Sequence, residues 1–133
     1  MTDTEGRATA LVIGHKDFAA GLVSAVTAIT GRADLFRTVS NYGLDTRAME
    51  DLVRAAIADG VTVIFSDLPA GSTTMAARRA QRDHPQVTVV TGVSLPVLID
   101  YAFAAADAPH AADAAVEKGR AAMIVTRGTP RAD

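Results

Sequence analysis

The sequence has 133 residues, 49% of them hydrophobic, which is the size of one ordinary domain with a substantial core. Its 13 Lys and Arg against 15 Asp and Glu give a formal net charge of −2, which argues against nucleic acid or an anionic membrane as a partner. Cysteine is absent, so a disulfide framework, a thiolate metal site and a cysteine nucleophile are excluded. Any chemistry must use histidine, carboxylate, hydroxyl or backbone groups.

No part of the sequence is typical of an export signal or a membrane span. The N-terminal "MTDTEGRATA" is polar and acidic and lacks the basic start and long apolar core of a signal peptide. No apolar segment approaches the roughly 20 residues that are needed to cross a bilayer. We therefore expect a cytoplasmic protein.

Strand and helix patterns alternate through the first half of the chain. "TALVIG" at 9–14 predicts a buried strand, and residues 17–29 repeat apolar side chains at helical spacing until a glycine ends the helix. "LFRTVS" at 35–40 predicts a weaker strand, since the arginine and threonine within it are typical of a sheet edge. The next helix is expected to begin after the N-cap residue Asp45 and to end at Gly60.

The second half continues the alternation. "VTVIFSD" at 61–67 is the clearest strand, Ser72 is the predicted cap of a third helix, and "VTVVTG" at 87–92 predicts a fourth strand. Two further helices are expected, at 94–106 and 108–121. The short apolar run at 121–125 predicts a fifth strand.

These patterns predict an α/β fold in which a mainly parallel central sheet lies between two helical layers. We predict one domain over 1–133, with loose ends at 1–8 and 127–133. Ligands of such open sheets bind outside the carboxyl ends of the strands, which are joined by right-handed crossovers. His15 follows the first strand and Asp67 ends the third, so both are expected at the same edge.

His15 is the main candidate for chemistry. Gly14 permits a tight exit from the strand, and a neutral imidazole at an exposed strand end can act as a nucleophile or base. Asp67 could accept a hydrogen bond from one ring nitrogen, which would fix the tautomer and leave the other nitrogen free to attack. The alternatives are a surface or capping histidine and an aspartate that caps the following turn.

The loop "DLPAGSTT" is a candidate anion site. It combines backbone N–H groups at a helix N-terminus with the hydroxyls of Ser72, Thr73 and Thr74, and phosphate is the natural ligand for such a cradle. Helix caps use the same residues without any ligand, which is the alternative. Neither GxxxxGK[ST] nor GxGxxG is present, so no motif supports a bound nucleotide.

Two other features lie near the proposed edge or on a neighbouring helix. "TGVSLP" at 91–96 follows the fourth strand and is a candidate lining of the site. Arg78, Arg79 and Arg82 crowd the third helix, either as a solvated face or as a contact for an acidic partner protein.

Three blocks of the sequence resemble the IIA component of mannose-type sugar phosphotransferase systems, which handle mannose, fructose, sorbose and N-acetylgalactosamine. "VIGHKDFAAGLVSA" is similar to the family's strand-end histidine block, and "VIFSDLPAGST" to its strand-Asp-Leu-x-Gly-Gly-Ser block. "VTVVTGVSLPVLID" is similar to its V-T-G-V-N-L-P-M-L block. Their order and spacing fit over residues 8–125.

The resemblance implies a phosphocarrier of the phosphoenolpyruvate-dependent system. His15 would accept a phosphoryl group from a histidine-phosphorylated carrier protein of the HPr type and pass it to a IIB component, with the membrane IIC and IID components taking part indirectly. Asp67 would orient the imidazole. No cofactor, metal or nucleic acid is implied.

The resemblance also bears on the loop and on assembly. The candidates for binding the phosphoryl oxygens are Gly71, Ser72 and Thr73, with Lys16 and Leu68 as further candidates. A homodimer is implied, in which the last strand, 121–125, exchanges between protomers and runs antiparallel to the others.

The sequence departs from the family pattern in places. Lys16 stands where the family commonly has a small residue, often Gly, and a cation there could hold a phosphoryl oxygen or repel a basic donor face. The family's Gly-Gly-Ser-Pro-Phe is Ala-Gly-Ser-Thr-Thr at 70–74, and Ser94 stands where Asn is usual. Two alternatives stay open: the phosphocarrier domain of a dihydroxyacetone kinase, whose usual "SHS" start fits "GHKDFAAGL" less well, and a non-catalytic regulatory module with the same fold.

Overall fold

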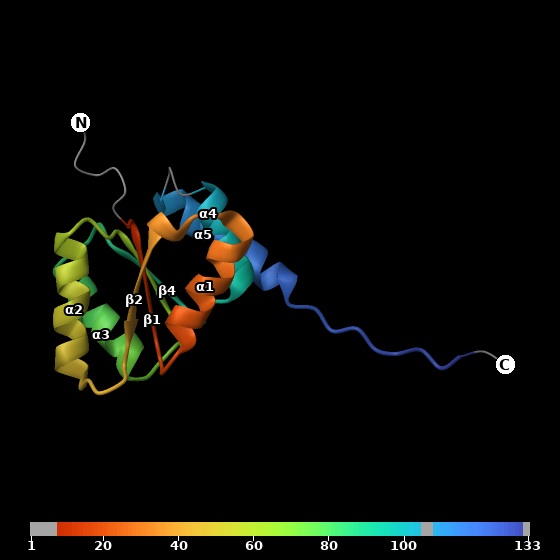
Figure 1. The fold of residues 1–133 in the computed structure, drawn as a ribbon, viewed down its shortest axis with the longest axis horizontal. Helices are drawn as coiled ribbons and strands as arrows, with labels where there is room; N and C mark the ends of the chain where they lie inside the picture. Colours follow the sequence, from red (N-terminus) through yellow and green to blue (C-terminus); the bar gives the residue numbers. More distant parts are fainter. Residues whose placement is uncertain (1–7, 105–107, 132–133) are drawn as a thin grey trace.

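Four parallel strands in the order β2-β1-β3-β4 form the centre of the molecule (Figure 1). The structure is a computed structural model that describes residues 8–104 and 108–131. The strands are β1 (Ala10–Gly14), β2 (Phe36–Ser40), β3 (Val63–Ser66) and β4 (Thr88–Thr91). All four predicted parallel strands are therefore confirmed, and the interrupted run at 35–40 is indeed an edge strand.

Helices cover both faces of this sheet, which confirms the predicted three-layer α/β class. Figure 1 shows α1, α4 and α5 on one side and α2 and α3 on the other. The helices are α1 (Phe18–Thr30), α2 (Thr46–Ala58), α3 (Ser72–Gln81), α4 (Leu95–Ala104) and α5 (Ala108–Ala122), and a short 3-10 turn, η1 (Ala33–Leu35), precedes β2. Every helix of the described ranges is too short or too polar to span a bilayer.

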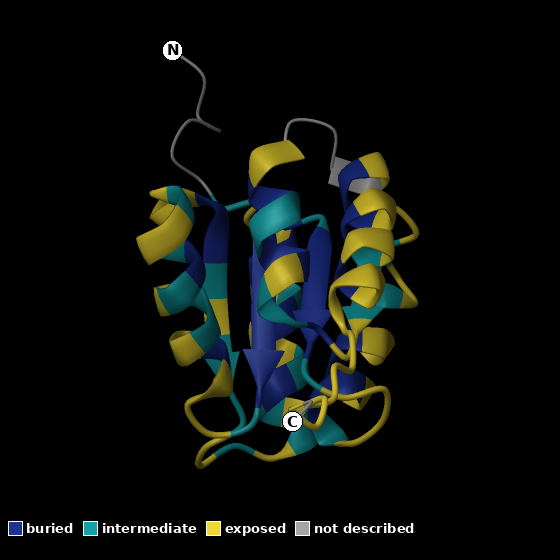
Figure 2. Ribbon diagram, turned by 90° about the vertical axis from the view of Figure 1, so that its right-hand side faces the viewer, coloured by how far each residue is buried: buried dark blue, intermediate teal, exposed yellow. Residues whose placement is uncertain are grey.

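The central strand β1 is buried on both faces. Ala10 and Val12 belong to the core under α1, α4 and α5, whereas Leu11 and Ile13 belong to the core under α2 and α3. All four side chains are inaccessible to solvent, and Figure 2 shows the central strands in dark blue, as buried. A central parallel strand needs apolar residues on both faces, which is why this strand reads as a continuous apolar run.

The helix caps agree with the sequence at two sites and differ at one. Asp45 accepts a hydrogen bond from the Ala48 N–H at 2.8 Å, and Gly31 ends α1 in the left-handed conformation. The predicted capping role of Ser72 is wrong: Gly71 is the N-cap of α3, and Ser72 is its first helical residue, with no side-chain cap bond. Gly71 has a φ of 108°, a backbone conformation that glycine adopts readily and side chains disfavour.

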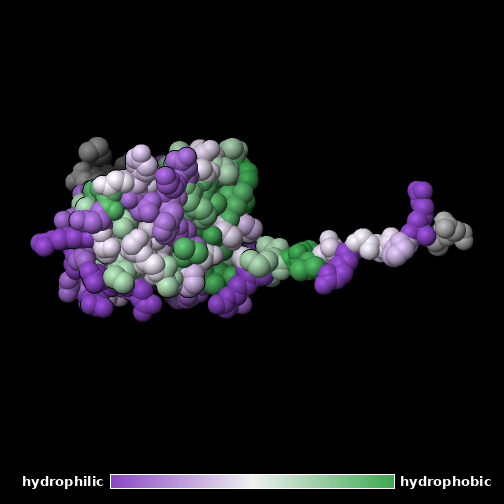
Figure 3. Space-filling model, turned by 90° about the horizontal axis from the view of Figure 1, so that it is seen from below, coloured by the Kyte–Doolittle hydropathy of each residue, from purple (hydrophilic) through white to green (hydrophobic). Residues whose placement is uncertain are grey.

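The predicted fifth strand is not formed within this chain. Residues 121–122 complete α5, and residues 123–131 run away from the body without strand pairing (Figure 1). Met123, Ile124 and Val125 are 83%, 75% and 79% exposed, and Figure 3 shows a hydrophobic stretch where this segment leaves the body. A strand needs a neighbour for its backbone hydrogen bonds, and this segment reaches no edge of its own sheet. The rest of the predicted loose ends, 1–7 and 132–133, lies outside the described residues.

Candidate functional site

His15 and Asp67 follow the carboxyl ends of two neighbouring strands, β1 and β3. The chain passes from β1 to β2 on one side and then returns across β1 to form β3, so the strand order reverses between β1 and β3. Ligands of open α/β sheets bind at such a switch point, outside the carboxyl ends of the strands. The strand arrows in Figure 2 point toward this edge, the lower end of the view. The predicted shared edge is confirmed.

The imidazole of His15 contacts the carboxylate of Asp67 directly. His15 Nδ1 lies 2.6 Å from Asp67 Oδ2, and the same oxygen accepts the backbone N–H of His15 at 2.8 Å. The Thr73 hydroxyl donates to the other oxygen, Oδ1, at 2.8 Å. Three hydrogen bonds on two oxygens fix the plane of the carboxylate.

The charge state of Asp67 assigns the histidine tautomer. Burial by itself would raise the pKa of Asp67, but the hydrogen bonds from the His15 ring, the His15 N–H and Thr73 outweigh it, and the pKa is lowered. An ionised carboxylate only accepts hydrogen bonds, so Nδ1 carries the hydrogen and Nε2 of the neutral ring keeps its lone pair. The His15 side chain is 41% exposed and that of Asp67 9%, so the ring can be reached from solvent while its partner is sheltered.

Gly14 makes this contact sterically possible. A Cβ at position 14 would lie 2.8 Å from Phe18 Cδ2 and 3.2 Å from Asp67 Oδ2. Real Cβ atoms do not approach other atoms as closely as the first of these distances, so a side chain would displace Phe18 or the carboxylate. The sequence predicted Gly14 for a tight strand exit; the structure adds that the space is needed by Asp67 and Phe18.

Three buried hydroxyl groups lie at the end of β3 and in the first turn of α3, on either side of Asp67 in the sequence. Ser66 Oγ lies 2.6 Å from Thr74 Oγ1, and the Thr74 hydroxyl also donates to the backbone carbonyl of Leu68. Thr73 and Thr74 are both buried. The Thr73 hydroxyl, a predicted phosphoryl ligand, donates its hydrogen to Asp67. Only the backbone N–H of Thr73 therefore stays a candidate for binding an anion. Composition could not separate these two roles.

Lys16, directly after the histidine, has a left-handed backbone conformation with a φ of 51°. Its N–H donates to Asn41 Oδ1 at 2.9 Å, its carbonyl accepts from the Ser40 hydroxyl at 2.8 Å, and its ammonium lies 5.1 Å from the centre of the Tyr42 ring. The loop after β2 therefore holds Lys16 in place. The sequence alone gave no sign of this, because the contacts join residues about 25 positions apart.

Two predicted features of the site remain, Leu68 and the segment at 91–96. Leu68 is 49% exposed beside Asp67, in the loop that leads to α3. The segment at 91–96, a predicted lining, instead borders a small cavity with Gly119 and Met123 at the end of α5. Within the described ranges, no hydrogen bond or ion pair joins it to His15, and no group of three or more His, Asp or Glu is placed to hold a metal ion.

Comparison with known families identifies the fold. The family described as "PTS system fructose IIA component" matches residues 9–118. The chain belongs to this family. Membership confirms the resemblance seen in the three sequence blocks, two of which contain His15 and Asp67, and it indicates a phosphotransferase role in general terms.

Solved structures of other IIA components share the fold. Phosphotransferase system component EIIA from Streptococcus agalactiae superposes with a TM-score of 0.81 at 13% identity, over 89% of this chain and 96% of that one. A IIA protein associated with the fucose utilization operon of Streptococcus pneumoniae gives 0.77 at 20% identity, over 90% and 93%. The mannose/sorbose-specific IIA subunit of Enterococcus faecalis gives 0.72 at 19%, over 96% and 99%. A sequence search of curated proteins finds no match.

Proposed function

We propose that this IIA component is a phosphocarrier that accepts a phosphoryl group from a phosphorylated HPr-type protein on His15 and passes it to a IIB component. The observation that supports this most is the 2.6 Å contact between His15 Nδ1 and the ionised Asp67, within the fold of the family. The contact directs the lone pair of Nε2 away from its partner and toward solvent. A nucleophile at an accessible strand end is what phosphoryl transfer between proteins requires.

The transfer step follows from this arrangement. Nε2 of His15 attacks the phosphorus of the donor's phosphohistidine in line; the new P–N bond forms as the donor's P–N bond breaks, and the donor imidazole leaves with its electron pair. The Nδ1 proton stays between His15 and Asp67, whose negative charge stabilises the positive charge that develops on the ring. In the onward step the acceptor's nucleophile attacks the same phosphorus and His15 is released.

The loop before α3 is the proposed site for the phosphoryl oxygens. The first N–H groups of a helix have no acceptor within the helix, so those of Ser72 and Thr73, with Gly71 at the N-cap, are available to an anion. The Ser72 hydroxyl is not used as a cap and can add a donor. Lys16 is the proposed source of positive charge, and the exposed Leu68 the proposed apolar contact for a partner. No metal or nucleotide takes part.

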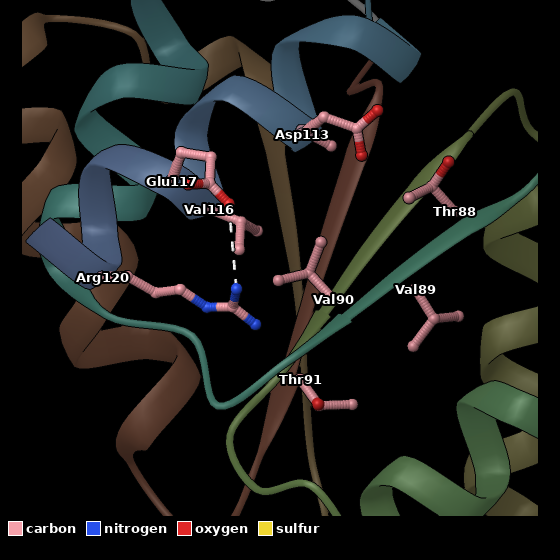
Figure 4. A pocket seen from close by; sticks show the side chains of 9 residues that line it. Thr88, Val89, Val90, Thr91, Asp113, Val116, Glu117 and Arg120 are labelled. Carbon is pink, nitrogen blue, oxygen red and sulfur yellow. Dashed lines mark ion pairs between the residues drawn. The ribbon is translucent and has the colours of Figure 1, made fainter.

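We further propose that the protein works as a homodimer. The open edge of β4 and helix α5 enclose a hollow of about 460 Å³ whose lining includes Thr88, Val90, Val116 and Arg120 (Figure 4). An exposed strand edge offers unpaired backbone groups to another chain. Residues 121–125 of a second protomer, antiparallel to β4, would pair with these backbone groups. The exchange would also bury the exposed apolar side chains of Met123, Ile124 and Val125 against the other protomer.

Labelling tests the transfer. When the protein is incubated with phosphoenolpyruvate, the general phosphotransferase enzyme and HPr, we expect an acid-labile phosphoprotein that His15→Ala abolishes. His84→Ala is the matched control, because His84 lies in the turn between α3 and β4, and it should label like the wild type. Label that persists in His15→Ala would show the assignment to be wrong.

Asp67→Ala tests the role of the carboxylate. We expect a folded protein in which transfer to His15 is slower by up to about 10⁴-fold, the loss that follows when the aspartate that orients a catalytic histidine is replaced. Unchanged transfer kinetics would reduce Asp67 to a turn cap. A wild-type chain that binds HPr but never takes up label would favour the regulatory alternative instead.

A further inference from the structure

Tyr42 is a large exposed aromatic side chain beside Lys16. It is 73% exposed, and the centre of its ring lies 5.1 Å from the Lys16 ammonium. Across the described residues its hydroxyl forms no hydrogen bond, and its ring belongs to neither hydrophobic core. The contact of this ring is therefore with the residue that directly follows the candidate nucleophile, His15.

A defined turn places Tyr42 at this position. The chain after β2 makes a β-turn in which the Leu44 N–H donates to the Asn41 carbonyl at 3.0 Å. Its third residue, Gly43, has a φ of 72°, which is typical of a type II turn. The Tyr42 N–H donates to Ser40 Oγ at 3.1 Å, and Leu44 packs against the core under α2 and α3. The turn is anchored at both ends, so its backbone fixes where the ring begins.

The same loop fixes the backbone of Lys16. Asn41 Oδ1 accepts the Lys16 N–H at 2.9 Å, and the Ser40 hydroxyl donates to the Lys16 carbonyl at 2.8 Å. The Asn41 N–H donates to the carbonyl of Gly14 at 3.1 Å, so the loop contacts the chain on both sides of His15. A lysine side chain loses much rotamer freedom when its ammonium must stay in one place. Here the backbone restrains one end of the side chain and the ring restrains the other.

The two sides of His15 carry different groups. β2 lies on one side of β1 and β3 on the other, so the Tyr42 turn belongs to the β2 side, and Asp67 and the start of α3 to the β3 side. The proposed backbone donors to a phosphoryl group lie at the start of α3. The Lys16 ammonium, held over the Tyr42 ring, adds a positive charge from the β2 side.

We propose that Tyr42 is a positioning residue for phosphoryl transfer, whose ring holds the Lys16 ammonium ready for an oxygen of the phosphoryl group that arrives at His15. The inference rests on the proposed function and adds a residue to it. Placing a group before the reaction lowers the activation barrier. An ammonium that serves the phosphoryl group changes the rate of transfer, whereas one that repels a basic donor face changes the KM for that donor. The two effects open to Lys16 are thus separable.

A protein donor and a small donor test this role. We expect Tyr42→Leu to slow single-turnover labelling of His15 by about two- to fivefold, the equivalent of an exposed cation–π contact. The loss should be the same with the phosphorylated HPr-type carrier and with phosphoramidate, and the KM for the carrier should stay within about twofold. Phosphoramidate has no docking surface: Nε2 attacks its phosphorus, its P–N bond breaks and ammonia leaves.

Two further variants are the controls for the ring. Tyr42→Phe keeps the ring and should restore most of the rate. Phe103→Leu makes the same kind of change at a side chain that is also 73% exposed, near the end of α4, and should label like the wild type. Failure of Tyr42→Phe to restore the rate, or an equal loss in Phe103→Leu, would overturn the inference.

A double variant and NMR show whether the effect passes through Lys16. In a Lys16→Gln background, Tyr42→Leu should cause no further loss of rate. The ring current of residue 42 should shift the ε-methylene protons of Lys16 in the wild type and in Tyr42→Phe, and the shift should be absent in Tyr42→Leu. A loss that persists without Lys16, or that appears only in the KM for the carrier, would make Tyr42 a docking contact and overturn the inference. An unshifted Lys16 signal in the wild type would also overturn it.

The small donor separates the inference from its premise. A wild type that takes label from phosphoramidate but not from the carrier would contradict the proposed function. The rate of Tyr42→Leu with phosphoramidate would then still decide the role of Tyr42, and a rate equal to that of the wild type would overturn it. A wild type that takes label from neither donor would overturn both.

Discussion

Lys16 carries backbone strain directly beside the candidate nucleophile. Its φ of 51° is a conformation that costs an ordinary L-residue roughly 1–2 kcal/mol, and contacts from Asn41, Ser40 and Tyr42 hold it there. Strain that neighbouring residues maintain beside a reactive group indicates a use for the side chain. In the proposed mechanism, that use is to place an ammonium where the phosphoryl charge arrives.

Lys16→Gly separates the backbone cost from the function of the charge. We expect the free energy of unfolding in urea to stay within about 0.5 kcal/mol of the wild type or to rise, since the relief of strain offsets the lost cation–π contact and the greater chain entropy of glycine. Single-turnover transfer should slow about tenfold, on the scale of one charged hydrogen bond. Lys16→Gln should slow transfer equally without gaining stability; two variants that transfer at the wild-type rate would show that the ammonium has no role.

Strand-end position was enough to predict that His15 and Asp67 share an edge, because parallel strands bring their carboxyl ends together whatever the loops do. It was not enough for Thr73 or Lys16. Thr73 is a plausible anion ligand by composition, and only the observed direction of its hydroxyl, toward Asp67 Oδ1, commits it to support. Lys16 depends on a loop that is distant in sequence, whose conformation no local pattern determines.

At the scale of elements, two helical glycines should respond oppositely to the same change. A Cβ on Gly119 of α5 would lie 2.2 Å from Val97 Cγ2 of α4, whereas nothing lies within 4 Å of a Cβ on Gly21 of α1. Val97 is buried and β-branched, so it cannot easily rotate away. We expect Gly119→Ala to lower the free energy of unfolding by about 1–2 kcal/mol and Gly21→Ala to raise it by about 0.5–1 kcal/mol.

Urea unfolding measures both changes, and a double variant identifies the cause. Gly119→Ala combined with Val97→Ala should lower the free energy of unfolding by less than the sum of the two single effects. The reason is that Val97→Ala removes the Cγ2 atom with which a Cβ at position 119 would clash. Strict additivity would contradict the steric explanation. This contact also shows a limit of pattern reading: a glycine within an alanine-rich helix has no periodic signal, and its reason is a neighbouring helix.

The strands that pair within this sheet were predictable, and the fate of the run at 121–125, which forms no strand in the described residues, was not. The first four strands are apolar runs bounded by turns, and each finds its neighbour in the same sheet. The run at 121–125 has the same composition, but α5 continues through Ala122 and carries the rest away from the open edge of β4. Local pattern cannot tell an apolar run that pairs within its own sheet from one that does not.

At the scale of the whole molecule, the oligomeric state that we expect depends on residues 121–125. Full burial of side chains such as Met123, Ile124 and Val125 contributes roughly 1.5–3 kcal/mol each, and an exchange would bury them twice per dimer. We expect light scattering after gel filtration to give a dimer for the full chain and a monomer for a chain that ends at Ala122. A chain that ends at Arg127 keeps the apolar residues and should remain dimeric, as the matched control.

The same variants connect assembly to stability and transfer. A dimer unfolds at a temperature that rises with protein concentration, and the chain ending at Ala122 should lose this dependence. It should still accept label on His15, because His15, Asp67 and Thr73 all come from one chain and none of their described contacts reaches α5. A truncated chain that stays dimeric would place the interface elsewhere, and one that stays folded but takes no label would make the partner protomer part of the transfer site.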